Sequence, residues 1–210
     1  MAALPIDRPD LQGSCMETRQ AYARISHLGG RVQALESAVV EFARGGLSAE
    51  QFRAQRVLYG IYEQRSAGTF MLRIGVPAGL IEASQLRALG QLAGEHGVTR
   101  VYLTTRQDIQ IHDLSLEAAV RLSREVASSG LTSFATGGNT VRNVVADPLS
   151  GLLSDDVFDV HPYALAIASH YLALADALIL PKKFKIALSA SELDRAGAVV
   201  ADLGFVAKLR

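Results

Sequence analysis

Residues 69–76 read TFMLRIGV and alternate between two kinds of side chain. Successive side chains of a β-strand point to opposite faces, so Phe70, Leu72 and Ile74 share one apolar face. Arg73 lies on the opposite face. The stretch therefore predicts a strand that covers a core with one side and presents a cation on the other.

Two helices and two more strands are predicted to follow this strand. Amphipathic spacing predicts helices over 81–96 and 115–129, and short apolar runs predict strands over 101–104 and 108–112. The inner face of the first helix is expected to carry Leu86, Leu89 and Ala93. The order strand–helix–strand–strand–helix is typical of a split, ferredoxin-like α+β arrangement.

Helical and mixed segments flank this unit. Apolar spacing predicts a helix over 16–44, and Ser48 is expected to cap a short helix that follows it. Beyond the unit, the sequence predicts an apolar helix at 163–180, a strand at 183–188, a short helix at 191–202 and a strand at 204–209.

Length, charge and cysteine content exclude several classes of protein. The 210 residues are 49% hydrophobic, which is enough to bury a core. Lys plus Arg number 21 and balance 21 Asp plus Glu, so we expect no nucleic-acid partner. The single cysteine, Cys15, cannot form an intrachain disulfide or a four-thiolate site.

The sequence predicts neither a signal peptide nor a membrane span. Residues 1–9 lack a basic start followed by an apolar run. The most apolar segment, 163–180, contains His170 and Asp176, which would be costly in lipid. We therefore expect a buried helix there and a cytoplasmic protein.

Polar and cationic side chains recur on one face of each central strand. Alternation places Gln110 with His112, and Lys183 with Lys185 and Ala187. If these faces converge, they form a concave cationic site for a polyanionic ligand. The alternative is that they are the solvated outer faces of half-buried strands. The glycine-rich run at 135–139 could let backbone approach a ligand, or be a turn.

Taken in order, several segments resemble the sirohaem-dependent nitrite and sulfite reductases. The resemblance covers roughly residues 50–210. The matching stretches are GIYEQR (60–65), FMLR (70–73), TTRQDIQIH (104–112), GLT (130–132), TVRNV (140–144), LPKKFKI (180–186) and DLGF (202–205). Their order and separations, rather than any one of them, carry the resemblance.

The resemblance implies a fold and a cofactor. The family's fold begins with a ferredoxin-like half-domain and continues into a sirohaem-binding domain. We therefore expect an α+β fold with an N-terminal helical segment (1–59), a ferredoxin-like half-domain (60–125) and the start of a sirohaem-binding α+β domain (126–210). Sirohaem carries eight carboxylates, so its pocket must be cationic.

The resemblance also implies roles for residues at matching positions. The residues that would contact the sirohaem periphery or lie near it are Arg106, Gln110, His112 and Asn143. The residues that match the cations around the distal face of the iron are Arg73, Arg142, Lys183 and Lys185. There they would hold an anionic substrate and stabilise departing oxygens, and the lysines could deliver protons.

One departure from the family concerns the iron–sulfur cluster. Family members bind a 4Fe–4S cluster through four cysteines in two close pairs, and one of these thiolates bridges to the sirohaem iron. Cys15 precedes the matching region and cannot replace them, so no metal ligand is expected in this chain. We expect the chain to be the N-terminal portion of a longer reductase, with the cluster bound by the remaining part.

Three functions remain open. The first is six-electron reduction of nitrite or sulfite, with electrons from a donor such as ferredoxin or a flavoprotein. The second is a cobalamin-pathway oxygenase of the precorrin-3B synthase type, which resembles the same family. The third is a ferredoxin-like binding module without catalysis. The same cations would serve nitrite or sulfite, so both substrates remain possible.

Overall fold

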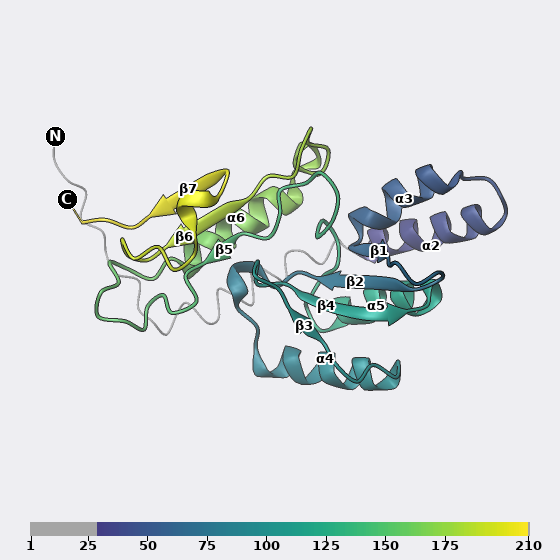
Figure 1. The fold of residues 1–210 in the computed structure, drawn as a ribbon, viewed down its shortest axis with the longest axis horizontal. Coiled ribbons are helices and arrows are strands. Elements are labelled where there is room, and N and C mark those ends of the chain that lie inside the picture. The colour runs from purple at the N-terminus through teal and green to yellow at the C-terminus, as the bar shows by residue number, and fades with distance from the viewer. Residues whose placement is uncertain (1–28, 210) are drawn as a thin grey trace.

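The computed structural model describes residues 29–209 (Figure 1). Cys15 and residues 16–28 of the helix expected over 16–44 lie outside these described residues. The helices are α2 (Gly29–Ala43), α3 (Ala49–Leu58), α4 (Ala83–Glu95), α5 (Leu116–Ser128) and α6 (His161–Ala173). The strands are β1 (Ile61–Glu63), β2 (Phe70–Ile74), β3 (Tyr102–Leu103), β4 (Ile109–Leu114), β5 (Val145–Ala146), β6 (Ile186–Ser189) and β7 (Leu203–Val206).

The first sheet is antiparallel and has the order β1-β2-β4-β3. Strand β4 lies between β2 and β3, which are joined through α4, so the unit is a split β-α-β arrangement. Together with the mixed second part, this confirms the predicted α+β fold class. In the register of β2 and β4, Arg73 lies opposite Gln110 and Ile74 lies opposite Ile109.

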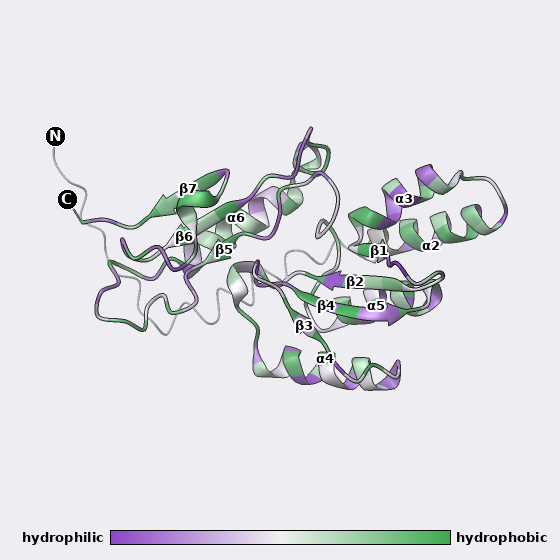
Figure 2. Ribbon diagram, in the orientation of Figure 1, coloured by the Kyte–Doolittle hydropathy of each residue, from purple (hydrophilic) through white to green (hydrophobic). Residues whose placement is uncertain are grey.

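The apolar face of this sheet forms the main core. Leu72, Ile74 and Ile111 are fully buried there and belong to the same cluster as residues of α4 and α5. Figure 2 shows both hydrophobic and hydrophilic residues along β2 and β4. The predicted separation into an apolar face and a polar face is therefore confirmed for β4. In β2, Leu72 and Ile74 are buried and Arg73 is half-buried as predicted, but Met71 is buried as well, next to a register shift between Phe70 and Leu72.

The inner face predicted for α4 is wrong at one of its three positions. Leu89 and Ala93 are buried, but Leu86 is 50% exposed. The side of α4 that contacts the core is centred between Gln85 and Leu89, and Leu86 lies about a quarter of a turn away from that centre. Spacing alone assigned Leu86 to the inner face, but the sheet leaves this edge of the helix uncovered.

Helix α3 begins where the sequence predicts. Ser48 Oγ accepts from the Gln51 backbone N–H at 3.2 Å, and Gln51 Oε1 accepts from the Ser48 N–H at 2.8 Å. Gly60 follows this helix with a φ of +72°. A Cβ at Gly60 would lie 2.3 Å from Thr136 Oγ1 and 2.6 Å from the Arg73 carbonyl oxygen, so only glycine lets these backbones approach.

The second sheet is parallel, in the order β5-β6-β7. The strand predicted at 183–188 begins only at Ile186, so both lysines precede it. Ala187 was predicted to share an open face with them, and this is wrong. Ala187 is 1% exposed and packs with Val145 and Ala198.

The prediction of a short helix over 191–202 is also wrong. This segment consists of turns and one 3₁₀ turn, Ala198–Val200. Asp194 and Gly197 have φ values of 48° and 68°, which interrupt a right-handed helix. The Asp194 carboxylate accepts hydrogen bonds from the backbone N–H groups of Ala198 and Val199, and these bonds favour the turn over a helix.

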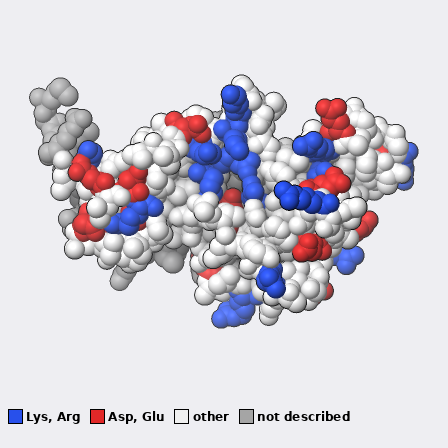
Figure 3. All heavy atoms as spheres, in the orientation of Figure 1, with Lys and Arg blue, Asp and Glu red and all other residues white. Residues whose placement is uncertain are grey.

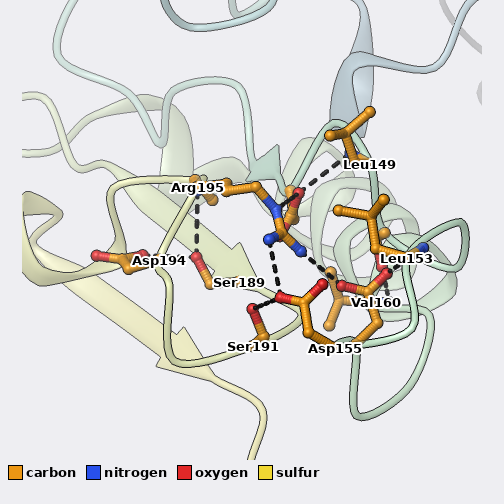
Figure 4. Close-up of polar contacts among 12 residues, drawn as sticks. Leu149, Leu153, Asp155, Val160, Ser189, Ser191, Asp194 and Arg195 are labelled. Carbon is orange, nitrogen blue, oxygen red and sulfur yellow. Dashed lines mark hydrogen bonds and ion pairs between the residues drawn. The ribbon is translucent and has the colours of Figure 1, made fainter.

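Arg195 joins this segment to the loop between β5 and α6 (Figure 4). Its Nε lies 3.1 Å from both carboxylate oxygens of Asp147, which is fully buried. Nη1 lies 3.0 Å from Asp155 and Nη2 lies 2.7 Å from Asp156. Hydrogen bonding to Arg195 lowers the pKa of Asp155 below its ordinary value. One guanidinium therefore holds three carboxylates of one loop.

The apolar segment at 163–180 does not form one long helix. Helix α6 ends at Ala173, and a 3₁₀ turn, Ala175–Leu178, follows it. Within residues 29–209, no helix has the length and apolar content to cross a membrane. Helix α6 instead packs on β5 and on the turn Pro77–Gly79, with Ala164 and Leu165 buried.

The different exposure of two leucines on α4 gives the first prediction. Leu89→Ala is expected to lower the free energy of unfolding by about 2–5 kcal/mol, because it leaves a cavity in the core. Leu86→Ala removes the same atoms from an exposed position and is expected to cost less than about 1 kcal/mol. Urea unfolding measures both, and equal losses would contradict this account of α4.

The second prediction concerns Arg195. Arg195→Met is expected to lower the midpoint temperature of unfolding by about 5 °C or more, because Asp147 would stay buried without its cation. The control Lys208→Met removes an exposed ion pair with Glu192 (2.6 Å) and is expected to shift the midpoint by less than about 1 °C. Scanning calorimetry compares them, and similar shifts would show that the Arg195 contacts do not stabilise the loop.

Candidate functional site

Arg73 lies on the face of β2 that α4 and α5 do not cover. Its Nη1 donates to the Thr136 carbonyl oxygen at 3.2 Å, and its guanidinium carbon lies 5.3 Å from the centre of the Tyr62 ring. The side-chain oxygen of Gln110 accepts from Arg73 Nη2 at 2.9 Å and Nε at 3.3 Å. These contacts fix the plane of a half-buried cation.

A chain of polar contacts continues from Arg73 along β4. The amide nitrogen of Gln110 lies 3.2 Å from His112 Nε2, and Gln64 Nε2 lies 3.2 Å from His112 Nδ1. The His112 ring packs on Tyr102 with 4.7 Å between ring centres. Three of the residues predicted from the sequence, Arg73, Gln110 and His112, are therefore in one connected group.

Arg106 and Asn143 connect the turn before β4 to the second sheet. Arg106 Nη2 donates to the carbonyl oxygens of Asn143 at 2.5 Å and Ile186 at 3.3 Å. Asn143 Nδ2 donates to the carbonyl oxygens of Arg106 at 2.9 Å and Val76 at 3.0 Å. Arg106 and Asn143, which the sequence predicts to contact the cofactor, therefore hold the first sheet and the second sheet together.

Gln107 adds a connection that the sequence reasoning missed. Its Nε2 donates to the Ala146 carbonyl oxygen at 2.7 Å, and its Oε1 accepts from the Ala146 N–H at 3.1 Å. The side chain therefore pairs with the edge of β5 as a backbone would. No local pattern signals this role, because the partner lies 39 residues away.

Asp108 lies at the centre of the site and was also missed. It is 5% exposed and experiences the charges of Arg73, Arg142 and Arg106. Burial raises the pKa of this carboxyl to about 6, against the opposing pull of the three arginines. Alternation with Gln110 was the available signal, because residues two apart in a strand share a face.

The remaining cations are brought in by pairing of two loop segments. Val141 forms a parallel bridge with Phe184, and the Arg142 N–H donates to the Phe184 carbonyl oxygen at 2.8 Å. Lys183 and Lys185 flank Phe184, so the pairing carries both lysines next to the Arg142 segment. Lys183 is exposed and Lys185 is half-buried.

Figure 3 shows Lys and Arg side chains gathered in the middle of one face of the molecule. This gathering agrees with the predicted convergence of cations, and the pairing of Val141 with Phe184 brings the lysines beside the Arg142 segment from loops and not from a strand face. The glycine-rich run has a packing role there. A Cβ at Gly137 would lie 1.9 Å from the Val57 carbonyl oxygen, so the run passes tightly against α3.

The site is composed of guanidinium, ammonium, amide and imidazole groups around the buried carboxyl group of Asp108. Across residues 29–209, no group of three or more His, Cys, Asp or Glu side chains is arranged to hold a metal ion. The arrangement can bind anions through charge-assisted hydrogen bonds. It can also stabilise negative charge that develops on a bound oxygen.

Comparison with known proteins agrees with this chemistry. The ferredoxin–nitrite reductase of Synechococcus elongatus is 31% identical over 143 residues, which are 66% of this chain and 28% of that protein. That of Leptolyngbya laminosa is 30% identical over 182 residues, 82% of this chain and 36% of that protein. The solved structure of the Mycobacterium tuberculosis NirA protein matches with a TM-score of 0.63 and 26% identity, covering 70% of this chain and 30% of that chain.

The chain thus spans about a third of the length of these relatives. The family described as "Nitrite/Sulfite reductase ferredoxin-like half domain" matches residues 62–129. The family described as "Nitrite and sulphite reductase 4Fe-4S domain" matches residues 137–210. These matches confirm the resemblance carried by the sequence motifs, and the chain belongs to the nitrite/sulfite reductase family.

Proposed function

We propose that this chain forms the cationic wall of a sirohaem-dependent reductase that converts nitrite by six-electron reduction. The observation that carries the proposal is the convergence of Arg73, Arg106 and Arg142 around Asp108. Three guanidinium groups at one place repel one another and cost stability unless anions balance them. A polyanionic cofactor and an anionic substrate would supply that balance.

The residues present fit sirohaem. Arg106 Nε is buried and has no hydrogen-bond partner among the described residues, so it is a donor that a cofactor carboxylate could satisfy. Gln110, His112 and Asn143 would border the same cofactor edge. When bound, sirohaem would supply the redox-active iron on which the substrate is reduced.

The other cations would act on the substrate. Arg73 and Arg142 would hold the oxyanion, because guanidinium groups pair well with anionic oxygens. Lys183 and Lys185 would stabilise and protonate departing oxygens. The fixed plane of Arg73, set by Gln110 and the Thr136 carbonyl, supports its role in orienting a small ligand.

Electrons would come from ferredoxin, the donor named for the two cyanobacterial relatives. A flavoprotein is the alternative donor. The thiolates of a 4Fe–4S cluster would have to come from outside these 210 residues, because Cys15 is their single cysteine. The division into segments 1–59, 60–125 and 126–210 also remains a proposal, and its second boundary falls inside α5.

Sulfite is the second candidate substrate. The matching family descriptions name both oxyanions, and the same four cations would serve either one. The cytoplasm remains the proposed location.

Cofactor binding provides the third prediction. The chain is expected to bind sirohaem, and Arg106→Gln is expected to weaken binding at least about tenfold because a charge-assisted bond is lost. The control Arg124→Gln changes an exposed arginine that pairs with Glu36 on the helical side, and binding should be unchanged. Absorbance titration measures both, and absence of binding by the unmodified chain would contradict the proposed cofactor.

Catalysis provides the fourth prediction. In the longer reductase that contains this chain, loaded with sirohaem and the 4Fe–4S cluster and supplied with reduced ferredoxin, Lys183→Ala and Lys185→Ala are expected to lower nitrite turnover at least about tenfold. Sirohaem content should stay within about twofold, because these lysines are assigned to the substrate. Lys208→Ala, outside the site, is the control. Equal losses of turnover and of cofactor would instead place the lysines in cofactor binding or folding.

A further inference from the structure

The buried carboxyl group of Asp108 has an unusual set of contacts. Its Oδ1 is buried and has no hydrogen-bond partner among the described residues. The Val76 backbone N–H lies close enough to favour the charged carboxylate and lower its pKa. A buried polar atom without a partner costs free energy, so its persistence at this site requires an explanation.

Positive charge faces Asp108 from three elements. Arg73 approaches from β2, Arg142 from the segment before β5, and Arg106 from the turn that carries Asp108 itself. Asp202, before β7, adds a negative charge near Arg106. These four groups and Asp108 form the local electrostatic environment.

The hydrogen bonds of the arginines go to other acceptors. Arg73 donates to the Thr136 carbonyl oxygen and Gln110, and Arg142 donates to the Gly138 carbonyl oxygen at 3.1 Å. Arg106 donates to backbone carbonyl oxygens of the second sheet. Across the described residues, none of the three forms a hydrogen bond with Asp108, so they stabilise its charge only through space.

An anion bound by these arginines would remove that through-space support. The negative charge of the ligand would offset the guanidinium charges and repel the carboxylate, while Asp108 would stay buried. We propose that Asp108 takes up a proton from solvent when an anion binds among Arg73, Arg106 and Arg142. The proton resides on the unpartnered Oδ1, and no bond to the ligand forms or breaks.

The direction of the pH dependence follows from linkage. Without the anion the pKa of Asp108 is about 6, and bound anion raises it further. Between the two pKa values the free protein carries the carboxylate and the complex carries the acid. Anion affinity is therefore level below pH about 6 and falls by up to about tenfold per pH unit above it, until the pKa of the complex is reached.

This inference rests on the proposed anion site and is tested with uroporphyrin, an iron-free tetrapyrrole with eight carboxylates. Calorimetric titration of the full chain at pH 7, in buffers with different heats of ionisation, measures the protons taken up per bound molecule. Asp108→Asn keeps the side-chain shape and removes the titrating group. Asp113→Asn, on the same strand and exposed, is the matched control.

The unmodified chain and Asp113→Asn are expected to take up about one proton more per bound uroporphyrin than Asp108→Asn. Equal uptake by all three proteins would overturn the role of Asp108 and leave the proposed function intact. Failure of the unmodified chain to bind uroporphyrin would overturn the anion site itself, and the inference with it.

A second measurement does not depend on the folding of the variant. The carboxyl carbon of Asp108 in the isotope-labelled, unmodified chain reports its protonation by nuclear magnetic resonance. Its titration midpoint is expected near pH 6 and should move upward when uroporphyrin is added. A midpoint that does not move on binding would contradict proton uptake at this residue.

Discussion

The placement of the first-sheet site residues beside those of the second sheet depends on side chains that bond to backbone across the two sheets. Arg106, Gln107 and Asn143 form a junction between the two sheets, because each donates to a carbonyl oxygen on its opposite side. Buried carbonyl groups need hydrogen-bond partners, so these bonds are costly to break and hold the turn before β4 against β5 and β6. The alignment of the cations from the first sheet with those from the second follows from this junction.

The junction also concentrates positive charge in a chain whose formal net charge is zero. The net charge of a chain does not reveal such a local concentration of positive charge, because the balancing carboxylates lie elsewhere. Asp147, Asp155 and Asp156, for example, surround Arg195 in the second part of the structure. Asp108 is the acidic side chain buried among the arginines of the site, and one carboxylate does not balance three guanidinium groups. The remaining positive charge is what favours an anionic ligand.

Features fixed by local spacing were predictable from the sequence. The two faces of β4, and the Ser48 cap, depend on residues at most a few positions apart. Features fixed by distant partners were not predictable. Leu86 is exposed because of where α4 rests on the sheet, and the turn that replaced the helix over 191–202 depends on Asp194. The roles that the resemblance gives to the eight site residues remain predictions, although the structure brings their segments together.

From Asp108 to Ile111 the chain alternates between the site and the core. Arg106, Asp108 and Gln110 reach the cationic site, while Ile109 and Ile111 lie in the hydrophobic cluster. A shift of one residue in a strand exchanges its two faces. An inserted or deleted codon here would therefore bury charge and expose isoleucine at once, so a change in the length of this segment would disrupt the site and the core together.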